Sequence, residues 1–243
     1  MRAKTFLDLC IDRYGTRRYR FRTDRCKRGT IEGMETRRKG PIGRPRGFDA
    51  DRALERAMRV FWRQGYEGAS LTDLTSAMGI NRTSMYAAFG NKEELFRKAL
   101  ERYTEGPASY AARALGEPTS RQVADAFLHG SARATTQPDC PAGCLGVQGS
   151  LAAGEPGRNA RDTLADWRNE YTSHLRDRLR RAVEEGDLPP DTDPGALARY
   201  LMAVANGIAV QAASGATYDE LRQVADMALR SWPPATAPTR PAG

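Results

Sequence analysis

The stretch 70–96, SLTDLTSAMGINRTSMYAAFGNKEELF, constrains the fold of this chain more than any other part of it. Ser70 can cap a helix, because its hydroxyl can accept an otherwise unpaired backbone N–H. Three apolar residues then fall on one helical face, at spacings i, i+3 and i+7: Leu71, Leu74 and Met78. Gly79 follows at once, and only glycine enters a left-handed turn without steric cost. The pattern predicts a short helix that ends in a tight turn.

A second short helix is predicted directly after this turn, with Asn81 as its cap. Met85 and Phe89 lie four residues apart and point inward, which leaves the polar residues Arg82, Thr83, Ser84 and Tyr86 on other faces. Asn91 caps a third helix that returns to the core at Leu95 and Phe96. The segment is therefore predicted to be a helix-turn-helix, whose second helix presents its N-terminal end to base edges in the major groove of DNA.

These residues resemble the DNA-binding domain of the TetR/AcrR family of one-component bacterial regulators. The matching features run from about Gly43 to Tyr103 and comprise the Ser70 start, Asp73-Leu74, Ala77-x-Gly79-Ile80-Asn81, Met85-Tyr86-x-x-Phe89 and Asn91-Lys92-Glu93-Glu94-Leu95-Phe96. Thr83 departs from the pattern, because many members carry Gly, Pro or Ala there. This departure leaves the base preference open but not the expected fold.

The predicted DNA contacts fall into three groups. Arg82 and Thr83 start the recognition helix, and an arginine there can pair bidentately with guanine O6 and N7. Phosphate contacts are expected from hydroxyls and helix N-termini, and the resemblance implies them at Tyr86 and Lys92. A Gly-Arg-Pro-Arg arm at 43–46 is stiff and basic, as minor-groove arms are. The full predicted set is Arg44, Arg46, Ser70, Asn81, Arg82, Thr83, Ser84, Tyr86 and Lys92.

The positive charge of the chain is concentrated before and within this region. The whole chain of 243 residues carries a net charge of +8, and residues 1–43 hold 13 Lys and Arg against 5 Asp and Glu. A polyanion is therefore the expected partner of the N-terminal half. Three interpretations of residues 1–42 stay open: a disordered leader, which the composition favours, an arm that binds nucleic acid, or a leader that is absent because translation starts at Met34.

Apolar residues at helical spacing continue on both sides of this segment, and no strand pattern occurs. The predicted helices outside it are Asp49–Gln64, Lys92–Tyr103, Arg121–Thr135, Asn159–Glu185, Pro194–Ala213 and Tyr218–Trp232. The expected fold class is all-α, with a DNA-binding domain of three helices linked by a fourth helix to a helical effector-binding and dimerisation domain. The expected domains are 43–104 and 105–232, between the leader at 1–42 and a disordered tail at 233–243.

An aromatic face on the long helix is the candidate ligand site. Trp167, Tyr171 and His174 lie at i, i+4 and i+7, and aromatic walls with one polar tip suit a pocket. Phe127 on the preceding helix is a weaker candidate. A packed core is the commoner role for any one of these residues. The resemblance implies a small-molecule effector bound in this domain, but it carries over no ligand chemistry.

The last two helices are rich in Ala and Gly, which let helices approach closely. Packing within the chain would explain this composition, but the resemblance implies a homodimer formed by these two helices as a four-helix bundle. A two-fold dimer also fits a helix-turn-helix that reads only a few base pairs, because the second copy supplies the second half-site. The predicted interface residues are Leu201, Val204, Ile208, Val224 and Leu229.

Other kinds of site have little support. Cys140 and Cys144 form the one close pair of cysteines, and three intervening residues permit a strained disulfide and hence a thiol switch. Structural cysteines are the commoner case. Zinc needs two more ligands, and His129 alone does not supply them. No metal or cofactor is expected.

Catalytic motifs are missing as well: the sequence has no phosphate-binding glycine loop, no Gly-x-Ser-x-Gly and no His-Glu-x-x-His. The best apolar run, Leu201–Ala213, is shorter than the ~20 residues that span a membrane. The prediction is a cytoplasmic, ligand-responsive regulator, a repressor that binds a palindromic operator as a homodimer. The alternatives are a nonspecific nucleic-acid-binding protein that depends on the basic leader, and a thiol-switch regulator.

Overall fold

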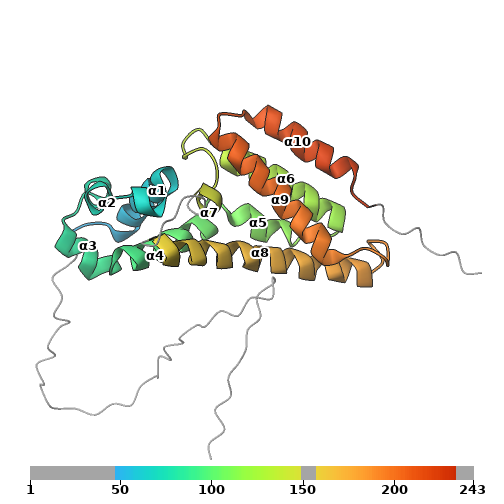
Figure 1. Ribbon diagram of the computed structural model, residues 1–243, viewed down its shortest axis with the longest axis horizontal. Helices are drawn as coiled ribbons and strands as arrows, with labels where there is room; N and C mark the ends of the chain where they lie inside the picture. Colours follow the sequence, from blue (N-terminus) through green and yellow to red (C-terminus); the bar gives the residue numbers. More distant parts are fainter. Residues whose placement is uncertain (1–46, 149–156, 234–243) are drawn as a thin grey trace, which may run out of the picture. The chain divides into compact units, whose positions relative to one another are not determined.

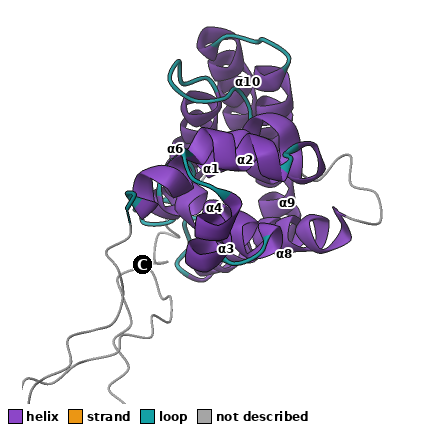
Figure 2. Cartoon of the chain, turned by 90° about the vertical axis from the view of Figure 1, so that its left-hand side faces the viewer, coloured by secondary structure: helices purple, strands orange, loops and turns teal. Residues whose placement is uncertain are grey.

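The computed structural model describes residues 47–148 and 157–233, and every regular element among these residues is a helix (Figure 2). The helices are α1 (Ala50–Gly68), α2 (Leu71–Met78), α3 (Arg82–Phe89), α4 (Lys92–Glu105), α5 (Ser109–Ala114), α6 (Ser120–Thr135), α7 (Leu145–Gln148), α8 (Arg158–Glu184), α9 (Pro194–Ala213) and α10 (Tyr218–Arg230). The expected all-α class is confirmed. The leader at 1–42, Arg44, Arg46 and residues 234–243 lie outside the described residues.

The boundaries of the first four helices follow from local side-chain chemistry. Asp49 caps α1, because its carboxylate accepts the N–H groups of the two residues at positions 51 and 52. Gly65, at φ 69°, interrupts the regular helix one residue after the predicted end at Gln64, and a short turn continues to Gly68. Asn91 starts α4 with a reciprocal pair of hydrogen bonds to Glu94, which is a capping box.

The buried apolar residues form two clusters. One surrounds the helix-turn-helix and contains Phe61, Trp62 and Phe96, but it also takes in Leu145 of α7 and Leu164 of α8. Helices α4 and α8 lie side by side there (Figure 1). The core of the DNA-binding half is therefore completed by residues from the second half of the chain.

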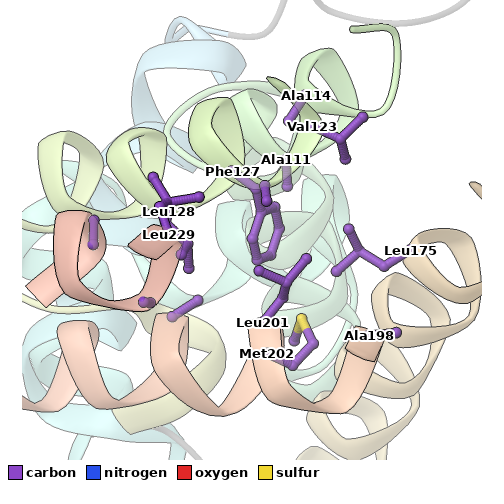
Figure 3. Packing of buried hydrophobic residues seen from close by; sticks show 14 of the residues in the cluster. Ala111, Ala114, Val123, Phe127, Leu128, Leu175, Ala198, Leu201, Met202 and Leu229 are labelled. Atoms are coloured by element: carbon purple, nitrogen blue, oxygen red, sulfur yellow. The ribbon is translucent and has the colours of Figure 1, made fainter. Parts of the chain in front are cut away.

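The second cluster joins helices α5, α6, α8, α9 and α10. Figure 3 shows the ring of Phe127 on α6 pointing between the helices toward Leu201 and Met202 of α9. By length and composition, α9 is the one described helix that could cross a membrane. Its apolar residues Leu201, Met202 and Ile208 are nevertheless buried in this cluster, as in a core helix of a soluble domain.

The sequence pattern did not predict two short helices, α5 and α7. Helix α5 has six residues and no side-chain cap, and α7 has four residues, so neither contains a full amphipathic period. The four longer helices after residue 105 match the prediction to within two residues at each end.

A group of three charged residues ties α1 to α4. Glu55 accepts hydrogen bonds from Nε of Arg102 at 2.8 Å and from Nε of Arg59 at 3.0 Å. Burial raises the pKa of Glu55, but the hydrogen bonds from Arg102 and Arg59 lower it by more, so that the pKa lies below its ordinary value. Because the folded pKa is depressed, this carboxylate stabilises the fold above its unfolded pKa, and the stabilisation disappears as the pH falls through the folded pKa.

We expect Glu55→Gln to lower the free energy of unfolding by about 0.5–1 kcal/mol at pH 7, since partners that are about a third exposed are screened by solvent. At about pH 3, below the ordinary glutamate pKa of about 4.3, the difference from the wild type should be smaller than at pH 7, because the stabilisation disappears as the pH falls through the folded pKa. Urea unfolding at both pH values measures it, with Glu101→Gln on the exposed side of α4 as the control. An equal loss at both pH values would assign the effect to packing rather than to charge.

Candidate nucleic-acid interface, internal cavity and apolar stripe

The helix-turn-helix is held by its own polar residues. Ser70 Oγ accepts the Asp73 N–H at 3.0 Å and donates to the Asp73 carboxylate at 2.6 Å, which lowers the pKa of Asp73. Gly79 adopts φ 72°, ψ 30° and ends α2, and the Asn81 side chain caps α3 by accepting the Ser84 N–H at 2.8 Å. Ser70 and Asn81, both predicted DNA contacts, are therefore engaged as helix caps, although both stay exposed.

Helix α3 turns its apolar side inward and its polar side to solvent. Met85 and Phe89 are buried, whereas Arg82 and Thr83 are exposed and Tyr86 keeps 46% of its surface accessible. Ser84 is half-buried. The predicted DNA-contact side chains of this helix thus lie on a surface that another molecule can reach.

Arg82 makes one contact that the sequence did not predict. Its Nη2 donates to Thr72 Oγ1 at 3.3 Å, which joins the start of α3 to the exposed side of α2. Thr72 lies off the apolar face of α2. Its position in the first turn, next to Leu71, was the only sequence signal for its contact with Arg82. This contact holds the guanidinium at the N-terminal end of the recognition helix.

Lys92 lies in the first turn of α4, with its ammonium 4.5 Å from the centroid of the Tyr66 ring. It is half-buried, and this burial lowers its pKa although Glu67 acts in the opposite direction. A cation over an aromatic face keeps a defined position. At a helix N-terminus, an ammonium and free backbone N–H groups together suit a phosphate.

We expect Lys92→Ala to weaken binding to all DNA sequences alike and to lower the slope of log K against log salt by about one unit per subunit. Fluorescence anisotropy over a salt series measures this slope for a specific and an unrelated duplex. Lys92→Arg is the matched control, because it keeps the positive charge. If Lys92→Ala altered the ratio of specific to nonspecific affinity while leaving the slope unchanged, Lys92 would not be a phosphate contact.

An internal cavity of about 30 Å³ lies between α5, α6, α7, α8 and α9. The predicted ligand residues Phe127, Trp167 and Tyr171 line it, together with residues not predicted: Ala108, Tyr110, Ala111, Ser131, Cys144, Val147, Met202, Ala205, Asn206 and Ala209. His174 is not among the lining residues, because it lies half-buried one turn beyond, edge-on to Tyr171 at 6.3 Å between ring centroids.

The described lining of this cavity includes no Asp, Glu, Lys or Arg. Burial raises the pKa of Tyr171 to about 12 and holds the pKa of Tyr110 well above its usual range. Burial also raises the pKa of the Cys144 thiol, against the opposing effect of a hydrogen bond with Tyr103. Around neutral pH the cavity therefore presents uncharged hydroxyl and thiol groups on an apolar wall.

Two residues of the cavity wall, Cys144 and Trp167, also contact helix α4 of the DNA-binding half. Tyr103 of α4 donates its hydroxyl to Cys144 Sγ at 3.2 Å, and Trp167 Nε1 donates to Thr104 Oγ1 at 2.8 Å. The contact continues to α1, because Trp62 Nε1 donates to the Gly143 carbonyl at 3.2 Å.

Aromatic rings follow the same path. The ring centroids of Trp62 and Tyr103 are 4.8 Å apart, those of Tyr103 and Trp167 are 6.1 Å apart, and those of Trp167 and Tyr171 are 4.8 Å apart. A change in the cavity can therefore reach α1 through residues in direct contact.

The predicted interface residues divide into buried and exposed positions. Leu201, Ile208 and Leu229 are at most 4% exposed and fill the core of the chain itself, and Val204 is half-buried against that core. A partner cannot reach the first three side chains in this conformation, which corrects their assignment to an interface. Only Val224, at 42% exposure, faces solvent.

An exposed apolar stripe runs along the opposite side of α9. Its members on α9 recur at spacings of three and four residues, and two further exposed apolar residues lie on the neighbouring helix α10; together they include four of the five most exposed large apolar residues described. We call it the α9–α10 stripe: Ala196, Tyr200, Ala203, Gly207, Val210, Val224 and Met227. An added Cβ at Gly207 would meet no atom within 4 Å, so packing within the chain does not require glycine there.

The chain is similar to known proteins over both halves. Residues 53–99 match the model for bacterial regulatory proteins of the tetR family, and residues 116–228 match the model for the tetracyclin repressor-like C-terminal domain. The HTH-type transcriptional repressor ComR of Escherichia coli strain K12 is 35% identical over 193 residues, which cover 79% of this chain and 92% of ComR.

Two solved structures are also similar. One is the TetR family transcriptional regulator CifR, as a cysteine mutant in complex with a 26-base-pair operator duplex; it is 43% identical, with a TM-score of 0.75, over 78% of this chain and all of that one. The other is a TetR regulator from Rhodococcus sp. RHA1, which is 43% identical with a TM-score of 0.55 over 77% of this chain and all of that one.

Proposed function

We propose that this chain, which belongs to the tetR family of bacterial regulatory proteins, is a cytoplasmic transcriptional repressor that binds a palindromic operator as a homodimer and releases it on binding a small molecule. The observation that carries the proposal is the polar face of α3, exposed on a helix-turn-helix, in a chain 43% identical to CifR bound to operator DNA.

In this proposal, Arg82 and Thr83 read base edges in the major groove, since they stand exposed at the first two positions of α3. Ser84, Tyr86 and Lys92 contact phosphates on either side of it, with Ser70 and Asn81 at the neighbouring helix ends. Arg44 and Arg46, which precede the described residues, add minor-groove contacts. Thr72 orients Arg82 through the hydrogen bond between them.

The proposed dimer forms through the α9–α10 stripe. Uncharged side chains at helical spacing are exposed on both helices, and Ala203 and Gly207 allow a partner helix to approach closely. Large exposed apolar patches on a soluble protein mark interaction sites. Two-fold symmetry then presents two copies of α3 to two half-sites of one duplex.

The proposed effector site is the internal cavity. A molecule bound in the cavity contacts Trp167 and Cys144, and both of these residues contact α4. Their displacement would favour a conformation in which the two recognition helices no longer fit successive major grooves. The effector then acts by population shift, provided that it binds the released conformation more tightly.

A thiol switch at Cys140 and Cys144 is the second candidate. In its favour, Cys144 lies on the path from the cavity to α4, so its modification would break the contact with Tyr103. Against it, both thiols are free, Cys140 contacts Gln137 instead, and burial raises the pKa of Cys144, which disfavours the reactive thiolate. Effector binding is therefore the stronger candidate.

The effector site is tested by screening small organic compounds for release of an operator duplex from the wild type and from Ala205→Val. The larger side chain occupies part of the cavity, so compounds that bind there should lose about ten-fold or more in potency. The operator affinity of each protein without compound serves as its own reference, because Ala205 lines the cavity. Compounds that release DNA equally from both proteins would act at another site.

A further inference from the structure

A second hollow adjoins the internal cavity on the other side of α5. It is an open cleft of about 610 Å³ between α5 and α6, lined by residues that include Arg113, Glu117, Gly130 and Arg133. Tyr110 lines both hollows. The side chain of Tyr110 thus borders two spaces of different character.

The position of Tyr110 explains how the partition is built. The Tyr110 ring packs against Gly130, and a Cβ added to Gly130 would lie 2.5 Å from this ring. The Tyr110 hydroxyl makes a hydrogen bond with Ser131, the residue after Gly130 in α6. Gly130 lines the cleft and Ser131 lines the cavity. The ring and hydroxyl of Tyr110 therefore span the boundary, and Gly130 provides the room for it.

The size of the cavity requires this boundary to open. About 30 Å³ holds little more than one or two water molecules. Organic ligands occupy pockets of about 300–1,000 Å³, a range that the cleft reaches and the cavity does not. An organic effector in contact with Trp167 and Tyr171 must therefore displace Tyr110 and extend into the cleft.

The charged side chains of the cleft favour ligands that carry a negative charge. Arg113 and Arg133 are exposed, and their described contacts are with hydroxyl groups, those of Ser109 at 2.8 Å and of Tyr218 at 3.5 Å. Neither guanidinium pairs with a carboxylate among the described residues, and Glu117 is the one acidic residue in the described lining. The cleft thus offers two planar cations that match a carboxylate, sulfonate or phosphate group.

We propose that the effector is an amphipathic organic anion that enters through the cleft, displaces Tyr110, places its apolar end in the cavity and leaves its acid group with Arg113 and Arg133. This inference rests on the proposed effector site and adds to it the route and the class of ligand. Tyr110 acts as the gate, since it is the one residue of the described lining that borders both spaces.

Two dyes with nearly the same aromatic body test the class of ligand. Anilinonaphthalene sulfonate carries an acid group, and N-phenylnaphthylamine does not. We expect the sulfonate to bind about ten-fold more tightly at low salt and to lose this advantage as the salt concentration rises. The double variant Arg113→Gln, Arg133→Gln should weaken the sulfonate about three- to ten-fold and leave the neutral dye unchanged. Equal affinities of the two dyes for the wild type would overturn the anion site.

The route and the location need separate variants. Tyr110→Ala should speed both association and dissociation of the dyes by about ten-fold in stopped-flow measurements, because the gate is removed; unchanged rates would overturn the route. Ala205→Val should weaken both dyes if they reach the cavity. If it did not, the dyes would bind elsewhere, on the α9–α10 stripe for example, and the proposal would fail. Circular dichroism confirms that each variant is folded.

Operator binding measured without dye distinguishes failure of the proposed function from failure of the proposed ligand class. This comparison uses the wild type, because Tyr110 lines the cavity and the cavity wall contacts α4. A wild type that binds the dyes as expected but no operator would contradict the proposed function alone. A wild type that binds operator but does not distinguish the dyes would contradict the ligand class alone.

Discussion

Gly207→Glu is expected to turn the proposed dimer into a monomer and to weaken operator binding about 100-fold or more. Within the chain this substitution meets no obstacle, because an added Cβ at Gly207 contacts nothing within 4 Å. Replacing glycine in the middle of a helix should even favour the monomer fold by about 0.5–1 kcal/mol. In the proposed dimer, however, the new carboxylates would be buried in the interface without a partner, and such charges cost several kcal/mol.

Two controls separate dissociation from other effects. Ala112→Glu adds the same charge at an exposed position of α5, outside the α9–α10 stripe, and should leave both assembly and operator affinity unchanged. Gly207→Ala adds only a methyl group and should remain dimeric. Sedimentation velocity reports the mass and circular dichroism the helical content. A fully folded Gly207→Glu variant that still sediments as a dimer would place the interface elsewhere.

Arg82→Ala is expected to cost about 1–3 kcal/mol for each half-site and to relax the preference at one base pair of each. With two copies on one operator, the affinity for the specific sequence should fall about 30-fold or more, while unrelated DNA loses much less. The reason is that a guanidinium pairs with a base edge only when that base is present. Thr72→Val should produce a smaller loss of the same kind, because it removes the hydrogen bond that orients Arg82.

Lys92→Ala serves as the contrast to Arg82→Ala. It removes a charge next to the same DNA surface but is expected to lower specific and nonspecific affinity in the same proportion. Anisotropy titrations of each variant with the specific duplex and with an unrelated one measure this proportion. If Arg82→Ala behaved like Lys92→Ala and weakened both duplexes equally, Arg82 would contact phosphate and would not read bases.

The helix-turn-helix could be predicted closely because its signals are local. Ser70, Gly79 and Asn81 act on backbone groups only a few residues away, so their effect does not depend on the rest of the fold. The apolar spacing of Met85 and Phe89 then fixes which side of α3 is buried. The hydrogen bond between Thr72 and Arg82 depends on the packing angle of two helices, which spacing within one helix does not specify.

The interface residues show where periodicity stops being informative. Helix α9 is apolar on both sides, so its stripe can be drawn through Leu201 and Ile208 or through Tyr200 and Val210. Leu201 and Ile208 are buried, whereas Tyr200 and Val210 are exposed. The choice between the two sides is made by the packing of α6 and α8 against α9, which periodicity within α9 does not specify. The small size of residue 207 was the available sequence signal for the exposed side of α9. Gly207 lies on that side, where packing within the chain does not require glycine.

The cavity was predicted in part for a similar reason. Trp167 and Tyr171 share a face of α8, and Phe127 meets them because α6 packs nearby. His174 continues the same sequence spacing but falls past the end of the cavity. Tyr110 and Cys144 belong to short segments without periodicity, and their positions depend on tertiary contacts such as the hydrogen bond from Tyr103.

Selection of bound duplexes from random DNA by the purified chain of 243 residues tests most directly whether a symmetric dimer reads an operator. We expect a two-fold symmetric sequence whose half-sites are centred about 10 base pairs apart or a small multiple of that distance, as two recognition helices on one face of the duplex require. Gly207→Glu should lose this enrichment, and Ala112→Glu should keep it. Enrichment of a single unrepeated site by the wild type, or of no sequence at all, would contradict the account.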